Sequence, residues 1–160
     1  YTNSNAGYPE VRDAVAKSLN ERFGTAFEEK NIVMTVGAAG GLNVALKILL
    51  NPGDEVITFA PYFGEYRSYT ANFDGVLIAV SPDTETFQPK LDEFEAKITA
   101  KTKAVIVNTP NNPTGVVYSE DTIKKMASDV VDDYIIDLDT LIVNILQVMQ
   151  NQTLFSSVLM

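Results

Sequence analysis

The stretch from Asn108 to Gly115 reads NTPNNPTG, and it directly follows the apolar run AVIV at residues 104–107. Asn, Pro and Gly are common in tight surface turns for stereochemical reasons. The carboxyl end of a buried strand is also where open α/β sheets bind their ligands. The octet by itself leaves both a surface turn and a ligand site open, so the surrounding sequence has to decide between them.

Outward from the octet, strand-like apolar runs alternate with segments of helical periodicity, which is typical of a parallel α/β sheet. The predicted strands are residues 32–36, 56–59, 76–80 and 104–107. One predicted helix begins at Pro9 and ends at Gly24, and others cover 42–50 and 90–98. A further helix opens at Ser119, which we expect to be its N-cap. The fold class is therefore predicted as α/β, a mostly parallel sheet flanked by helices.

Composition limits the classes of function. The chain has 160 residues and a formal net charge of −9, which argues against a nucleic-acid partner because phosphate neutralisation needs clustered Lys and Arg. It contains no Cys and no His, which excludes disulfides, thiol chemistry and catalysis by an imidazole. No apolar stretch approaches the roughly 18 residues of a membrane span, and no signal peptide is visible. We expect a cytoplasmic protein with no membrane partner.

The composition changes near residue 126. Residues 126–160 contain no Lys, Arg, Gly, Pro or Glu, although residues 1–125 use all five types. An apolar stripe that includes Leu138, Leu141 and Ile145 fits an amphipathic helix. We therefore expect one partial domain at residues 1–125 and a divergent, helical tail at residues 126–160.

Two further segments at the ends of predicted strands could contact a ligand. GAAGG, residues 37–41, lies between a strand and a helix, where unpaired amides and the helix dipole favour a phosphate. A turn that needs glycine only for its dihedral angles is the alternative. APYFGEY, residues 60–66, offers aromatic rings that either pack at the rim of the core or stack on a flat heteroaromatic ligand.

Four segments in order carry a family resemblance: AGYPEVRDAVA, TVGAAGGLNVAL, PGDEVITFAPYFGEY and TKAVIVNTPNNPTGVVYS. Residues 6–125 resemble the class I/II aminotransferases of fold type I, which depend on pyridoxal 5'-phosphate, and are similar to the aspartate aminotransferase branch. The resemblance implies the first half of the large, cofactor-binding domain. It also implies amino transfer between an amino acid and a 2-oxo acid, and assembly into a homo-oligomer. With this resemblance the octet corresponds to the family's Asn-Pro-Thr-Gly signature, so the ligand site is favoured.

The resemblance also implies roles for single residues. Gly37, Ala38 and Ala39 would form the cradle of the cofactor phosphate, with backbone amides from the two alanines. Phe63 would stack on the pyridine ring. Asn112 would donate to the phenolic oxygen of the cofactor and help to hold the substrate carboxylate. No metal ion is implied.

Tyr1 is a candidate for the tyrosine that reaches a partner subunit's phosphate, but it lies one residue further from the AGYPE segment than the family pattern places it. The family also uses an acidic residue on the pyridine nitrogen, a Schiff-base lysine and an arginine for the substrate carboxylate, all after the Asn-Pro-Thr-Gly signature. Residues 126–160 stand in their place here. Asp137 or Asp139 could take the acidic role, although neither falls at the family's spacing.

No lysine of this chain lies in the family's Schiff-base segment, so we expect no catalytic residue here and an isolated chain without activity. The lysines in question are Lys17, Lys30, Lys47, Lys90, Lys97, Lys101, Lys103, Lys124 and Lys125. Two alternatives stay open. One is a non-catalytic interaction or assembly module, and the other is a related fold type I lyase or synthase.

Overall fold

A computed structural model of the chain describes residues 5–132. The described residues form two compact units that meet in the sequence between Gly41 and Leu42. Helix α2, Gly37–Leu49, begins in the first unit and continues into the second. No helix in residues 5–132 is long and apolar enough to cross a membrane.

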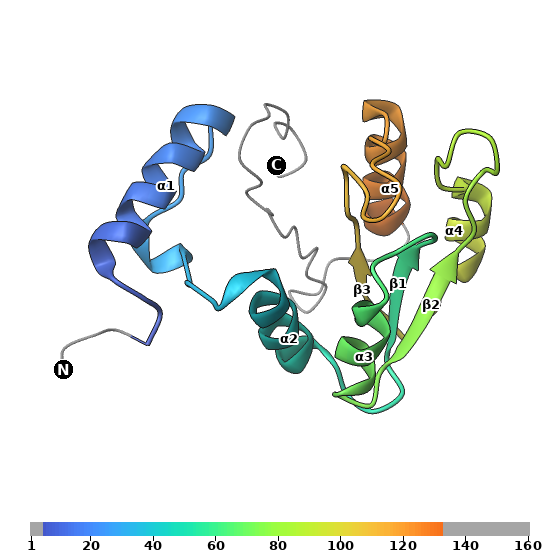
Figure 1. The fold of residues 1–160 in the computed structure, drawn as a ribbon, viewed down its shortest axis with the longest axis horizontal. Helices are drawn as coiled ribbons and strands as arrows, with labels where there is room; N and C mark the ends of the chain where they lie inside the picture. Colours follow the sequence, from blue (N-terminus) through green and yellow to red (C-terminus); the bar gives the residue numbers. More distant parts are fainter. Residues whose placement is uncertain (1–4, 133–160) are drawn as a thin grey trace. The chain divides into compact units, whose positions relative to one another are not determined.

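The second unit contains a parallel sheet of three strands in the order β2-β1-β3 (Figure 1). The strands are β1 Glu55–Phe59, β2 Val76–Val80 and β3 Thr102–Ile106. Three helices alternate with or follow them: α3 Glu65–Ala71, α4 Leu91–Lys97 and α5 Glu120–Asp132. The predicted α/β class, with a parallel sheet flanked by helices, is confirmed.

Both faces of this sheet are covered by helices, because successive residues of a strand point to opposite sides. Ile57 and Phe59 of β1 pack on one side with Phe94 of α4 and Met126 of α5. Val56 of β1 packs on the other side in a second cluster, with Leu42 and Leu46 of α2 and Tyr66 of α3. The near-continuous apolar sequence of β1 follows from this double burial.

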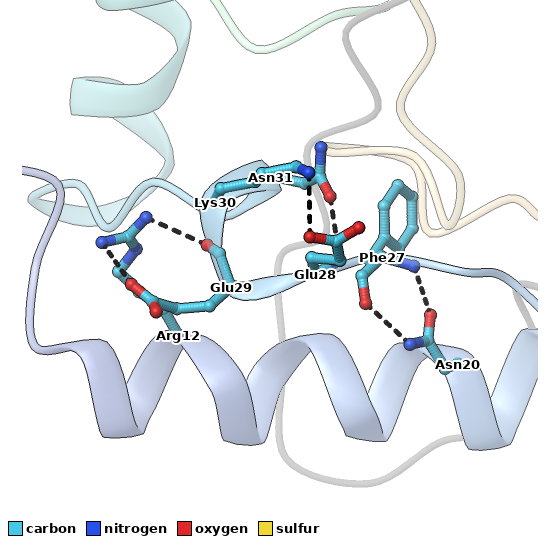
Figure 2. Close-up of polar contacts among 7 residues, drawn as sticks. All are labelled: Arg12, Asn20, Phe27, Glu28, Glu29, Lys30 and Asn31. Carbon is cyan, nitrogen blue, oxygen red and sulfur yellow. Dashed lines mark hydrogen bonds and ion pairs between the residues drawn. The ribbon is translucent and has the colours of Figure 1, made fainter.

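The first unit is built around α1, Pro9–Phe23, and a short 3-10 helix, η1, Glu29–Asn31. As predicted, Pro9 occupies the first turn of α1, and Gly24 ends it in the left-handed conformation with φ 67°. The side chain of Asn20 closes the following loop: its amide donates to the Phe27 carbonyl at 2.8 Å, and its oxygen accepts from the Phe27 amide at 2.7 Å (Figure 2). These contacts fold the segment after α1 back along the helix.

The buried side of α1 carries a charged residue, and an apolar residue of the helix is exposed. Arg12 and Ala16 are buried, whereas Val11 is 41% exposed. The guanidinium of Arg12 donates to the Ile32 carbonyl at 2.7 Å. It also donates to the Glu29 carbonyl at 3.0 Å and pairs with the Glu29 carboxylate at 2.9 Å (Figure 2). A charged side chain, satisfied by the backbone of the neighbouring segment, therefore holds α1 to η1.

The strand predicted at residues 32–36 is wrong. Residues 32–35 have no regular secondary structure, and the side chains of Val33 and Val36 are 60% and 94% exposed. A strand requires a hydrogen-bonded neighbour, and here the Met34 amide donates to the Ala6 carbonyl of an irregular segment instead. An apolar run indicates burial in a sheet only where a partner strand is present.

The other predicted elements are present with shifted ends. β1 and β3 begin at Glu55 and Thr102, which is earlier than the apolar runs suggested, and α3 had not been predicted. Ser119 is the N-cap of α5 as predicted, because its Oγ accepts from the Thr122 amide at 3.0 Å. Tyr1, Asp137, Asp139 and residues 133–160 of the predicted tail lie outside the described residues.

Candidate functional site

Two of the predicted site residues follow neighbouring parallel strands of the second unit. Phe63 comes four residues after β1 ends at Phe59, and Asn112 comes six residues after β3 ends at Ile106. Carboxyl ends of adjacent parallel strands meet at one edge of the sheet, so both segments leave it there.

The two adjacent asparagines of the octet have different roles. The Asn111 side chain is buried, with 6% of the residue exposed, and its oxygen accepts from the Thr114 amide and hydroxyl at 3.2 and 2.8 Å. Its backbone amide donates to the Val116 carbonyl, and its carbonyl accepts from the Gly115 amide. Gly115 turns the chain with φ 74°, a left-handed conformation that favours glycine. The hydrogen bonds of Asn111 therefore stabilise the turn itself.

The Asn112 carboxamide is exposed, and it forms no hydrogen bond with any other residue that the structure describes. Its backbone is nevertheless fixed. The orientation of the Asn108 carboxamide is assigned from its hydrogen-bond partners, and in this orientation the Asn108 oxygen accepts from the Asn112 amide at 3.1 Å. An amide side chain carries two donor hydrogens and one acceptor oxygen. Here these groups face outward on an ordered turn, which is the arrangement expected of a ligand contact.

Phe63 is 39% exposed and packs edge-on against the ring of Tyr66, with ring centroids 5.8 Å apart and an interplanar angle of 75°. Tyr66 lies in the first turn of α3 and is itself buried, stacked at 6.4 Å on Tyr62. The edge of Tyr66 supports one side of the Phe63 ring. Part of the Phe63 ring remains open to a flat ligand.

A hydrogen bond links these two segments. The Tyr66 hydroxyl donates to the same Asn108 oxygen that accepts from the Asn112 amide, at 3.2 Å, and the Asn108 amide group donates to the Pro110 carbonyl at 3.1 Å. Burial raises the pKa of Tyr66 above its ordinary value, more than the hydrogen bond with Asn108 lowers it. The hydroxyl therefore stays protonated at neutral pH and remains a donor.

Gly37, Ala38 and Ala39 form the first turn of α2 in the first unit. Gly37 has φ 67°, so the chain enters the helix through a conformation that favours glycine. The Thr35 hydroxyl donates to the Gly37 carbonyl at 3.0 Å and steadies this entry. The Gly37 amide donates to the Thr35 carbonyl at 3.0 Å. The first turn of a helix lies at the positive end of its dipole, which favours an anion.

Tyr66, Asn108 and Asn111 had not been singled out from the sequence. These residues support the residues proposed to contact a ligand and are not themselves proposed as ligand contacts. The only signal for Asn108 was its place at the start of the octet, and the signal for Tyr66 was its place at the end of APYFGEY. Within residues 5–132 no group of three or more His, Cys, Asp or Glu side chains could hold a metal ion.

Residues 2–136 match the family described as aminotransferase class I and II. The match covers most of the chain and includes every segment described above. The chain belongs to this family.

The relatives of this aminotransferase chain are longer proteins. The aspartate aminotransferase of Thermotoga maritima is 42% identical over 113 residues, which are 70% of this chain and 30% of that protein. A probable aspartate/prephenate aminotransferase of Aquifex aeolicus is 38% identical over 123 residues, 76% of this chain and 31% of that protein. The aminotransferase chain thus spans about a third of the length of the curated relatives it matches.

Solved structures agree in fold. An aminotransferase from Eubacterium rectale superimposes with a TM-score of 0.79 at 43% identity, covering 82% of this chain and 33% of that one. Thermus thermophilus aspartate aminotransferase with maleate gives a TM-score of 0.77 at 34% identity, covering 81% and 34%. The aminotransferase chain has the fold of part of such enzymes.

Proposed function

We propose that this chain is part of the cofactor-binding domain of an aminotransferase that uses pyridoxal 5'-phosphate to move an amino group from an amino acid to a 2-oxo acid. The observation that carries the proposal is the exposed carboxamide of Asn112, which has no partner within residues 5–132, on a turn held by the hydrogen bonds of Asn108 and Asn111. Family membership and the fold of the solved neighbours support the same conclusion.

The donor set fits the cofactor. The Asn112 carboxamide can donate to a phenolic oxygen, and the open side of the Phe63 ring can cover a pyridine ring. The first turn of α2 offers amides of small residues to a phosphate. An aromatic ring, a phenolic oxygen and a phosphate are the three groups that the cofactor presents.

The bound cofactor supplies an electron sink that allows bonds to the α-carbon of an amino acid to break. The residues of this chain would bind and orient it. In the second unit, Asn112 would donate to the phenolic oxygen of the ring, and Phe63 would exclude water from one face of it. In the first unit, Ala38 and Ala39 are the residues proposed to hold the phosphate through their backbone amides. Gly37 would allow the close approach of the backbone to that phosphate.

We also propose that the isolated chain lacks activity, because no lysine takes the place of the one that binds the cofactor covalently. Support comes from lysines that are already occupied on the surface. Lys17, Lys97 and Lys124 each pair with a carboxylate one helical turn away. The names of the relatives refer to several different substrates, so we propose amino acids as a class and not one particular amino acid.

The remaining features of the proposal are a homo-oligomeric assembly, a cytoplasmic location, and a boundary near residue 126 where a divergent helical tail follows the partial domain. The residues of that tail from 133 on are outside the described part.

The proposal is tested by titrating the 160-residue chain with pyridoxal 5'-phosphate and following absorbance, then reducing with borohydride and mapping lysine adducts by mass spectrometry. We expect weak saturable binding without a single modified lysine, and no turnover of aspartate with 2-oxoglutarate. Binding should be lost on Asn112→Ala. A stoichiometric adduct on one lysine, with turnover that disappears when that lysine is replaced, would overturn the inactivity. Absence of any saturable binding would overturn the cofactor site.

A further inference from the structure

Tyr66 joins the two halves of the candidate site in the second unit. Its ring supports Phe63 edge-on at 5.8 Å, and its hydroxyl donates to Asn108 at 3.2 Å. The residue is only 7% exposed, so it does not itself offer a surface to a ligand. It contacts Phe63 directly and is linked to Asn112 through Asn108.

Asn108 links Tyr66 to the turn through hydrogen bonds. Its carboxamide oxygen accepts from the Tyr66 hydroxyl and from the Asn112 amide, and its amide group donates to the Pro110 carbonyl. Its oxygen and its amide group thus both have partners. An oxygen shared by two donors holds both at a fixed separation, so a movement of the Tyr66 hydroxyl would be felt at the Asn112 backbone.

The other side of the turn is closed by Asn111, which bonds both groups of Thr114. The hydrogen bonds of Asn108 and Asn111 thus hold the turn around Asn112, while the carboxamide of Asn112 remains exposed. The backbone fixes the direction of the Asn112 Cα–Cβ bond, from which the carboxamide extends.

We infer that Tyr66 is a positioning residue of this site: through Asn108 it holds the Asn112 carboxamide, and through its ring edge it holds Phe63, at one fixed spacing. The inference rests on the proposed function, since the ligand that this spacing fits is the pyridine ring and phenolic oxygen of the cofactor. Tyr66 touches neither group itself. It acts through the residues that do.

The test uses variants that keep the aromatic ring. Tyr66→Phe removes only the hydroxyl, and Tyr69→Phe is the matched control on the same helix, since Tyr69 is partly buried against the core and no hydrogen bond joins it to the octet in the described residues. The probe is pyridoxine 5'-phosphate, which lacks the aldehyde and so cannot react with surface lysines. We expect Tyr66→Phe to weaken binding roughly two- to tenfold, the range for one lost hydrogen bond. Tyr69→Phe should leave the affinity unchanged.

A double variant separates positioning from packing. If Tyr66 acts through Asn112, Tyr66→Phe has no further effect on affinity in the Asn112→Ala background. Equal effects of Tyr66→Phe in both backgrounds would overturn the inference, because the hydroxyl would then act by another route.

A second readout needs no ligand. Hydrogen exchange of the Asn112 backbone amide, measured by NMR on the ligand-free chain, should become severalfold faster in Tyr66→Phe and in Asn108→Ala, and stay unchanged in Tyr69→Phe. If the unmodified chain binds no pyridoxine phosphate, the proposed function fails, while this exchange measurement still decides the positioning role. Unchanged exchange in both variants would overturn the role of Tyr66.

Discussion

At the scale of single residues, two adjacent asparagines have different roles because one is buried and the other is exposed. Asn111 and Asn112 both follow β3 in the octet, yet the first is buried and bonded to Thr114, and the second is exposed. Most buried polar groups are hydrogen-bonded, and here the turn supplies partners to the side chain of Asn111 and not to that of Asn112. The pair therefore combines a structural amide with a ligand-binding amide.

Replacement of each asparagine by alanine should separate these roles. We expect Asn111→Ala to lower the free energy of unfolding by about 1–3 kcal/mol, because the Thr114 amide loses its acceptor. Asn112→Ala should change it by less than about 0.5 kcal/mol, as an exposed substitution does, and should affect pyridoxine phosphate binding instead. Urea unfolding followed by circular dichroism measures both, and equal destabilisation by the two variants would contradict this assignment.

Thr70 differs from Asn111, because its buried hydroxyl has no hydrogen-bond partner among the described residues. It is fully buried on α3, and its Oγ1 has no hydrogen-bond partner in the described part of the chain. Thr70→Val keeps the branched shape and removes the unsatisfied group, so we expect a gain of about 1 kcal/mol in unfolding free energy.

Thr109→Val is the matched control for this substitution. Thr109 is also buried, but its Oγ1 accepts from the Tyr118 amide at 2.9 Å. The same substitution should therefore destabilise by about 1–3 kcal/mol. Thermal or urea unfolding of the two valine variants should shift in opposite directions, and a shift in the same direction would contradict the argument.

At the scale of elements, polar contacts rather than apolar packing hold α1 to η1. The Arg12 guanidinium contacts the carbonyl and the carboxylate of Glu29 (Figure 2) and the carbonyl of Ile32. Removing a buried charged donor leaves its acceptors without a partner, which costs more than the net value of the bonds. The segment that leads to the first turn of α2 depends on this contact.

Arg12→Met retains the aliphatic stem and removes the donors, and we expect it to lower the local stability of the first unit by about 2–3 kcal/mol. Hydrogen exchange of the α1 and η1 amides measures this, with the amides of the central strand β1 as an internal reference. Arg22→Met is the control, since Arg22 is exposed and lies over the Phe23 ring at 4.8 Å. Equal loss of protection in the two variants would show that Arg12 has no special role.

At the scale of the whole molecule, the sheet of the described part ends on both sides. With the order β2-β1-β3, β2 and β3 each have one strand neighbour within residues 5–132. Unpaired strand edges are templates for association. The chain spans about a third of the length of the relatives that it matches.

We therefore expect the isolated chain to associate, with a mass in static light scattering that rises with concentration. We also expect the apolar stripe of residues 138–149, which lies outside the described residues, to pack against the sheet or a second subunit, so deletion of residues 138–160 is the informative comparison. A stable monomer after this deletion would contradict a sheet edge as the associating surface, because both edges remain.

The alternation of apolar runs with helical stripes determined the α/β class by itself, since strand and helix periods follow from local geometry. The local caps at Pro9, Gly24 and Ser119 were also predictable, because each satisfies backbone groups of its own segment. The motifs were sufficient to propose Phe63 and Asn112 as ligand contacts.

Only the tertiary structure decided which apolar run becomes a strand and which side chains support the site. Residues 32–36 have the composition of a strand but no hydrogen-bonding neighbour, and pairing between distant segments is not encoded in either segment alone. Likewise, the bridge from Tyr66 through Asn108 to Asn112 joins residues 42 to 46 positions apart. That contact exists because parallel strands β1 and β3 bring their carboxyl ends to one edge, a proximity that depends on the sheet and not on spacing in the sequence.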